Sequence, residues 1–272
     1  MAPSQLPELL GLESPPRSLV GITADLERRS RGPQRSRGSA AEAFLRQLAG
    51  LDRGLPPSDR SFIRKVMDRV RRGDLPDLPE AEPRADLLPQ LPSAIRVWAA
   101  RAEALAVELG ARGEEAHARA AAISALHVAE RMGWPTMDAF VAGRFHDHGR
   151  ILLAQLAAED AGPRETTLSQ LSDGLHPALG AVLLERWGLS MGIQLAVENH
   201  HQPPTAVPRL VRPFAQIVRA ADLLARVIVD DGRSAAQVAQ SLERVCLELG
   251  IEPEMGLLDA ILRDASPYVE AP

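Results

Sequence analysis

Five prolines lie within residues 74–92 (DLPDLPEAEPRADLLPQLP), and this segment constrains the fold of the chain more than any other. Proline lacks a backbone N–H and its ring clashes with the preceding helical turn, so the segment cannot form a single helix. Apolar residues at helical spacing occur on both sides of it, over 39–73 and over 93–263. We therefore expect a linker between two helical regions.

This linker sets the expected division of the chain. Residues 1–38 are rich in Pro, Ser, Gly and Arg and have no apolar period, which is typical of a flexible tail. Residues 39–90 are expected to form a helical hairpin, with helices over 39–51 and 58–73, followed by the linker itself. Residues 91–272 are expected to form the main helical domain.

The composition favours helices over strands, and we expect an all-α fold. Ala, Leu, Arg and Glu dominate, while aromatic residues make up only 3% of the chain. The polar residues 159–174 are expected to form a loop, so that His176 precedes a helix that starts at Pro177. Ser190 is expected to cap the following helix. Helices in the main domain are expected over 93–109, 114–132, 136–145, 149–158, 177–188, 191–201, 209–230, 234–249 and 253–263.

Charge and cysteine content bear on partners and location. The net charge is −5, and residues 91–272 hold 16 basic and 23 acidic side chains, so DNA is not an expected partner. The single cysteine, Cys246, excludes an internal disulfide and fits a reducing compartment. No stretch approaches the ~18 apolar residues needed to span a bilayer, and no signal segment is evident. We therefore expect a cytoplasmic protein without a membrane partner.

The segment AFVAGRFHDHGR, residues 139–150, contains the adjacent pair His146 and Asp147. Imidazole nitrogen and carboxylate oxygen are both good ligands for divalent first-row metals. A single histidine is more often a hydrogen-bonded interior residue or a surface residue than a ligand. Here, however, further residues of the same types lie on or beside expected helices: His117, His176, His200, His201 and Asp222.

The order of these residues resembles a known signature. His117, the His146 and Asp147 pair 29 residues later, and Asp222 in VRAADLLARV are similar to the H, HD, D pattern of the HD superfamily of metal-dependent phosphohydrolases. More specifically, AFVAGRFHDHGRILL, HPALGAVLLERWGLSMGIQLAVENHH and the upstream RVRRGDLPDLP resemble the HD-related output domain family, HDOD. The resemblance covers roughly residues 85–230. It implies an HD-domain helical bundle, with the small N-terminal helical region in addition, and a role in signalling.

The resemblance also implies a metal site. His117, His146, Asp147 and Asp222 match the four HD metal ligands. The other three histidines match the extra histidines of the HD-GYP branch, which often binds two or more metals: His176, His200 and His201. Many HDOD proteins have lost several of these residues, so the complete set here favours a working site. The GYP tripeptide is missing, and Gln202 stands where HD-GYP proteins place an acidic residue, so cyclic di-GMP hydrolysis is not expected.

Such a ligand set suits phosphate chemistry. Two divalent ions about 3.5 to 4 Å apart, bridged by a carboxylate and a hydroxide, place a nucleophile in line with phosphorus and neutralise phosphoryl charge. Asp147 is the expected bridge and a catalytic residue. The first ion would take His117, His146 and Asp222, and the second would take the other three histidines. Arg150, one turn beyond Asp147, would meet a substrate phosphate, unless it is a surface or capping arginine.

Two functions remain as hypotheses. The first is a phosphohydrolase that uses one or two divalent transition-metal ions, such as Mn or Fe, on a phosphodiester or phosphomonoester, including nucleotides. The second is a catalytically inactive HDOD signalling module that binds a ligand or a protein partner. Of the remaining histidines, His127 is expected outside the metal site. His148 is expected either to support a ligand or to face solvent.

Overall fold

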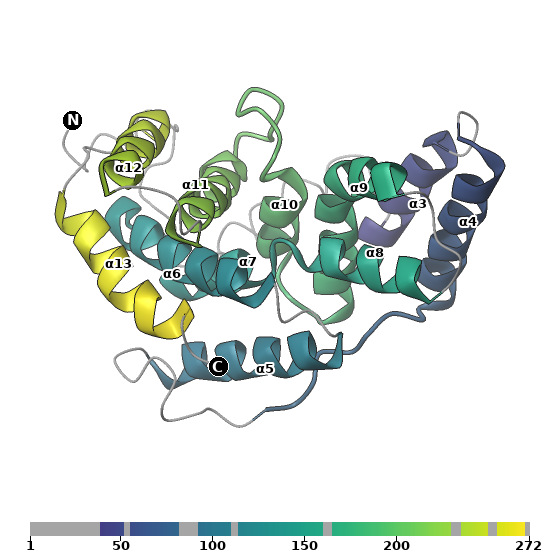
Figure 1. The fold of residues 1–272 in the computed structure, drawn as a ribbon, viewed down its shortest axis with the longest axis horizontal. Helices are drawn as coiled ribbons and strands as arrows, with labels where there is room; N and C mark the ends of the chain where they lie inside the picture. The colour runs from purple at the N-terminus through teal and green to yellow at the C-terminus, as the bar shows by residue number, and fades with distance from the viewer. Residues whose placement is uncertain are drawn as a thin grey trace, which may run out of the picture.

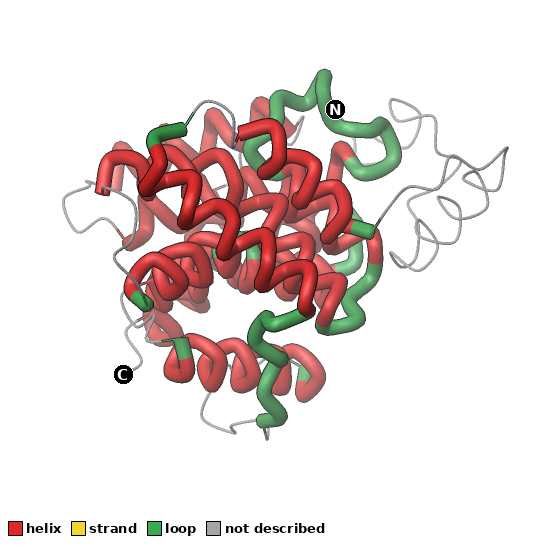
Figure 2. Tube along the Cα trace, turned by 90° about the vertical axis from the view of Figure 1, so that its right-hand side faces the viewer, coloured by secondary structure: helices red, strands yellow, loops and turns green. Residues whose placement is uncertain are grey.

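The computed structural model describes residues 39–51, 55–81, 92–109, 114–159, 165–229, 235–249 and 255–269. Within these ranges the chain forms helices and no strand (Figures 1 and 2). The expected all-α class is therefore confirmed. In the same ranges, none of the helices has both the length and the apolar character that crossing a membrane requires. The expected tail, residues 1–38, lies outside the described residues.

Most helices lie within a few residues of their expected bounds. Their ends follow local signals: the Ser190 hydroxyl accepts a hydrogen bond from the backbone N–H of Ile193 at the start of α10, as expected for a cap. In chain order the helices are α3 (Ala40–Leu51), α4 (Pro57–Arg72), α5 (Ser93–Glu108), α6 (Glu115–Met132), α7 (Thr136–Phe145), α8 (His148–Ala158), α9 (Glu165–Arg186), α10 (Met191–Asn199), α11 (Arg212–Val229), α12 (Ala235–Leu249) and α13 (Met255–Val269).

The helix α9 differs most from expectation. Residues 165–174 are helical, so the expected loop over 159–174 is wrong for these residues, and His176 lies in the middle of α9 rather than at its start. Residues 160–164 lie outside the described residues. Leu171, Leu175 and Leu179 recur at helical spacing and are all buried, and this burial outweighs the cost of Pro177 inside the helix. At 22 residues α9 is also longer than α11, which we expected to be the longest helix.

The C-terminal helix also extends beyond its expected end. We expected it to stop at residue 263, but α13 continues to Val269 and contains Pro267. Ala265 is fully buried in a cluster with Ile95 and Ile123, so the apolar stripe of the helix continues past residue 263. Packing against α5 and α6 therefore explains the longer helix.

The hairpin α3–α4 lies at one end of the molecule and α12–α13 at the opposite end (Figure 1). The hairpin shares a hydrophobic cluster with α8 and α9, in which Phe44 and Ile63 pack with Leu153 and Leu179. The expected boundary between the hairpin and the main domain remains a prediction. The shared cluster supports α8 and α9, which carry part of the site described below.

Helix α6 lies at the centre of the second large cluster and packs against α7, α11 and α13. Its buried face is mostly alanine, which allows neighbouring helices to approach closely. A Cβ atom at Gly143 of α7 would lie 2.7 Å from the carbonyl oxygen of Ala121, so only glycine fits at this crossing. This packing places His117 of α6 beside His146 at the end of α7.

Candidate metal centre

The structure brings all seven expected ligand residues together from five helices and the turns between them. His117 lies in the first turn of α6, and His146 and Asp147 form the junction between α7 and α8. His176 comes from the middle of α9, and Asp222 from the middle of α11. The remaining two residues, His200 and His201, directly follow the last residue of α10. No two adjacent helices supply the whole set, so the site depends on the complete packing of the bundle.

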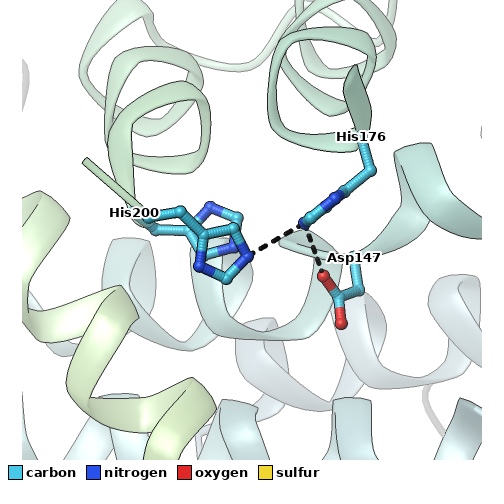
Figure 3. A group of neighbouring side chains, drawn as sticks. Asp147, His176 and His200 are labelled. Carbon is cyan, nitrogen blue, oxygen red and sulfur yellow. Dashed lines mark hydrogen bonds and ion pairs between the residues drawn. The ribbon is translucent and has the colours of Figure 1, made fainter. Parts of the chain in front are cut away.

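The seven residues form two groups that share Asp147. One group is His117, His146, Asp147 and Asp222, and the other is Asp147, His176, His200 and His201; the potential ligand atoms within each group lie within 4.8 Å of one another. The two carboxylate oxygens of Asp147 face different groups. Oδ2 lies 3.4 Å from His146 Nε2, and Oδ1 lies 3.1 Å from His176 Nε2 (Figure 3). This division suits a carboxylate that bridges two ions.

Breaks in the helices explain how neighbouring residues reach one site. Adjacent residues on a helix point about 100° apart, so they share a target only where the helix ends. Asp147 has φ −99° and ψ 4°, outside the helical region, and separates α7 from α8. His200 ends α10, and its ring centroid lies 3.9 Å from that of His201. Both pairs of neighbours therefore converge at helix ends.

Backbone carbonyl groups fix the orientation of three histidines. The Nδ1 atoms of His146, His176 and His200 lie 2.8, 2.7 and 2.6 Å from the carbonyl oxygens of Gly143, Ser172 and Val197. An Nδ1–H group that donates to a carbonyl leaves the Nε2 lone pair as the metal-binding atom. The Nε2 atoms of His146 and His176 both face the Asp147 carboxylate, and Figure 3 shows this for His176. The backbone thus selects the ligating tautomer.

The donor atoms of the site fit divalent cations. The Nε2 atoms of His117 and His146 lie 3.3 Å apart, and those of His176 and His201 lie 3.2 Å apart. Two imidazole lone pairs at that distance repel each other unless a proton or a cation lies between them. The buried Nε2 of His200 has no hydrogen-bond partner among the described residues. Five imidazoles and two carboxylates are also a donor set for first-row transition metals.

The family comparison agrees with this geometry. Residues 103–203 match the model of the HDOD domain. This segment of the chain is therefore similar to the HDOD domain. The match includes the six ligand candidates from His117 to His201 and ends before Asp222, which α11 contributes from outside the matched segment. The expected resemblance to HDOD is thereby confirmed.

Other comparisons add little about activity. The solved structure of a candidate phosphohydrolase from Shewanella amazonensis SB2B is similar over 98% of each chain, with 16% sequence identity and a TM-score of 0.46. At that score the two chains need not share a fold, and nothing about the activity of this chain follows from the similarity. No curated protein sequence matches the chain.

The charges within the site are strongly coupled. Burial opposes the charged form of His146, but the attraction of Asp147 and Asp222 raises the pKa of its imidazolium to about 9. Burial also opposes ionisation of Asp147, yet the positive charge of His146 and the hydrogen bond with His176 hold the pKa of that carboxyl well below its usual range. Burial lowers the pKa of His201 to about 4. Without metal, the site therefore holds a proton on His146.

Metal binding is expected to become about tenfold tighter for each pH unit between about pH 6 and pH 8, because the ion must displace the His146 proton. The affinity rises with pH because the pKa of His146 is raised. Below about pH 9 the protonated form of His146 dominates, so each unit of rising pH increases the ligating form tenfold. Competition with a chelating dye across this range measures the affinity. An affinity that is independent of pH would show that metal binding displaces no proton from His146 in this range.

A cavity of about 570 Å³ opens beside the two groups. His117, Asp147 and His201 form part of its wall, and four further charged residues complete the described lining: Glu114, Arg150, Asp173 and Arg226. Arg150 lies where the sequence placed it, beside Asp147, although its Nη1 donates to the carboxylate of Asp173 at 2.8 Å. A substrate in this cavity would touch ligand residues and both arginines.

Arg226 is a site residue that the sequence argument missed. Its Nε and Nη2 donate to the two oxygens of Asp222 at 3.0 and 2.9 Å, so this bidentate pair fixes the plane of the carboxylate. The same Asp222 Oδ1 lies 3.2 Å from His117 Nε2. The spacing of four residues between Asp222 and Arg226 on one helix was the available signal, since such residues are neighbours on a helix surface.

Two other polar residues near the HD pair are buried. Arg144 is fully buried and pairs with Glu115 of α6, so it lies in the packing between α6 and α7 and does not line the cavity. His148 is 1% exposed and packs between Phe145 and Trp187. Burial lowers the pKa of His148 to about 3, so its ring is neutral. Solvent exposure of His148, one of its two expected roles, is therefore wrong.

His127 lies outside the site, as expected. Its Nε2 lies 2.9 Å from the Asp264 carboxylate of α13, and its Nδ1 lies 3.7 Å from Glu130. The residue thus connects α6 to α13, on a part of α6 remote from His117 by several helical turns. It has a structural contact and no part in the two ligand groups.

Proposed function

We propose that this protein is a divalent-metal-dependent phosphohydrolase that acts on a phosphodiester or phosphomonoester in signal transduction. The observation that carries the proposal is the pair of ligand groups joined through Asp147, with one carboxylate oxygen facing each group. Structural metal sites in proteins are closed and need no adjoining space. Here the groups form the wall of an open cavity, which favours a catalytic role.

The residues of the chain would divide the work as follows. His117, His146 and Asp222 would hold one ion, and His176, His200 and His201 would hold the other. When bound, divalent ions supply Lewis acidity toward phosphoryl oxygens and lower the pKa of water. Asp147 would belong to both ligand groups and hold them next to each other. Arg150 and Arg226 would orient the phosphate group, since guanidinium matches the geometry of phosphate oxygens.

The metal-loaded protein is expected to hydrolyse p-nitrophenyl phosphate or bis(p-nitrophenyl) phosphate, and removal of the metal with a chelator should abolish the activity. His146→Ala should reduce kcat/KM at least about a hundredfold, because it removes a metal ligand. Release of p-nitrophenol measures the rate. His127→Ala is the matched control, since it removes a histidine outside the ligand groups. Equal rates in the wild type and His146→Ala would contradict the proposal.

The second candidate is a catalytically inactive signalling module that binds a ligand or a protein partner. The match to the HDOD domain favours it, because fold similarity does not establish chemistry. The two candidates differ in one measurable property. A metal-loaded protein that binds phosphate esters without hydrolysing them would favour the module over the enzyme.

A further inference from the structure

We infer that the cavity takes a small phosphate ester with one phosphoryl group and a non-aromatic organic part that carries hydroxyl or ammonium groups, and that it disfavours nucleotides. This inference rests on the proposed hydrolase function and narrows its substrate class. It comes from the chemistry of the lining: among the described residues, every side chain that lines the cavity is charged or is a histidine of the ligand groups.

Among the described residues, the cavity lining includes no aromatic or aliphatic side chain against which a nucleobase could pack. Proteins hold bases and other flat rings against aromatic or aliphatic side chains, since the faces of the ring are apolar. In the described part of the chain, no tryptophan, tyrosine, phenylalanine or aliphatic side chain lines this cavity. The two histidines in its wall face ligand groups, so their nitrogens are committed to the metal sites. A base would therefore have only histidine rings and guanidinium planes to stack on, and these are already held by the ligand groups and by the ion pairs with Asp173 and Asp222.

The volume of the cavity does not distinguish a nucleotide from a smaller ester. Ligand pockets range from about 300 to 1,000 Å³, and at 570 Å³ the cavity has room for either a nucleotide or a smaller ester. The lining therefore decides the substrate class. A small polar ester would leave space for water, which a charged and open cavity retains at little cost.

The charges of the lining favour a single phosphate. Arg150 and Arg226 are both already paired, with Asp173 and with Asp222. Glu114, at the start of α6 and three residues before His117, is exposed and has no ion-pair partner among the described residues. A second phosphate near Glu114 would meet a negative charge, whereas a hydroxyl or ammonium group would donate a hydrogen bond to it. Glu114 is thus placed to recognise the organic part of the substrate.

The first test compares substrates on the Mn²⁺-loaded full chain. We expect kcat/KM for glycerol 3-phosphate and ethanolamine phosphate to exceed that for adenosine monophosphate and adenosine diphosphate at least about tenfold. Release of inorganic phosphate measures each rate. Adenosine nucleotides that react as fast as the small esters, or faster, would overturn the inference and leave the hydrolase proposal standing. No hydrolysis of any ester, p-nitrophenyl phosphate included, would overturn both.

The second test separates recognition by Glu114 from stabilisation of α6. A carboxylate at a helix start also stabilises the helix by its charge, and that role would affect all substrates alike. If the inference holds, Glu114→Gln raises KM for ethanolamine phosphate about tenfold relative to KM for methyl phosphate, which has no donor to lose. Glu108→Gln, an exposed change outside the cavity, should leave both KM values unchanged. Equal KM changes for both substrates in Glu114→Gln would overturn the assignment.

Discussion

Protein purified without a chelator is expected to contain about two divalent transition-metal ions per chain, and the Asp147→Asn variant is expected to contain none. Asp147 belongs to both ligand groups, and its two oxygens face different histidines, so the change removes one ligand from each ion. It also removes the negative charge that holds two cations close together. Elemental analysis of the wild type and the variant measures the content directly.

The variant should fold normally, because asparagine has nearly the same volume and Asp147 lies at the junction of α7 and α8 rather than inside a helix. Far-UV circular dichroism should therefore show unchanged helix content. Asp173→Asn provides the matched control: Asp173 also lines the cavity, but it is 64% exposed and outside both ligand groups, so it should retain the metal. Equal metal content in wild type and Asp147→Asn would remove Asp147 from the site.

The number of ions also separates two versions of the site. A single ion per chain would indicate that only the group of His117, His146, Asp147 and Asp222 binds metal. His117→Ala would then lose it, and His201→Ala would keep it. No ion after addition of Mn²⁺ or Fe²⁺ would leave a ligand-binding module as the better explanation of the similarity to the HDOD domain.

Four of the ligand candidates lie beside a local signal in the sequence, whereas His176 lies inside a helix that was expected to start after it. The adjacent pair His146 and Asp147 precedes Gly149, and the pair His200 and His201 precedes two prolines, so both fall where helices end. Residues at helix ends face a common centre when the helices pack as a bundle. The chemistry of the set followed from its residue types, and its division into two groups that share Asp147 was expected from the family resemblance; the two groups in the structure have the same members.

The features that the sequence argument missed depend on contacts between distant residues. Residues 165–174 contain serines, threonines, an aspartate and a glycine, which favour a loop before Pro177, although Leu168, Leu171 and Leu175 have helical spacing. Their leucines pack against Phe44 and Ile63, more than 100 residues earlier in the chain. The burial of His148 and Arg144 has the same origin, since Trp187, just after α9, packs on His148 and Glu115 of α6 pairs with Arg144. Local pattern carries no information about such partners.

Gly149→Ala is expected to destabilise the protein by an amount at or above the upper end of the range of about 1 to 3 kcal/mol typical of overpacked sites. A Cβ atom at this position would lie 2.1 Å from the carbonyl oxygen of His176 and 2.7 Å from the backbone N of Gly180. Both contacts are to the backbone of α9, which cannot rotate away as a side chain can. The helices α8 and α9 must therefore separate.

That separation would act on the metal site as well as on stability. Asp147 directly precedes α8 and His176 lies in α9, and their 3.1 Å contact joins the two ligand groups at this crossing. We expect the ion held by His176, His200 and His201 to be lost first. Urea denaturation measures the free energy of unfolding, and elemental analysis of the folded variant measures the metal.

Gly174→Ala is the matched control for this prediction, because it adds the same methyl group to α9 two residues before His176. A Cβ atom there would meet nothing within 4 Å, so alanine should stabilise the helix by about 0.4 to 1 kcal/mol. The two variants are thus expected to move stability in opposite directions. If Gly149→Ala instead matched Gly174→Ala, then α8 and α9 could not lie in backbone contact. The close approach of Asp147 to His176, on which the shared site depends, would fail with it.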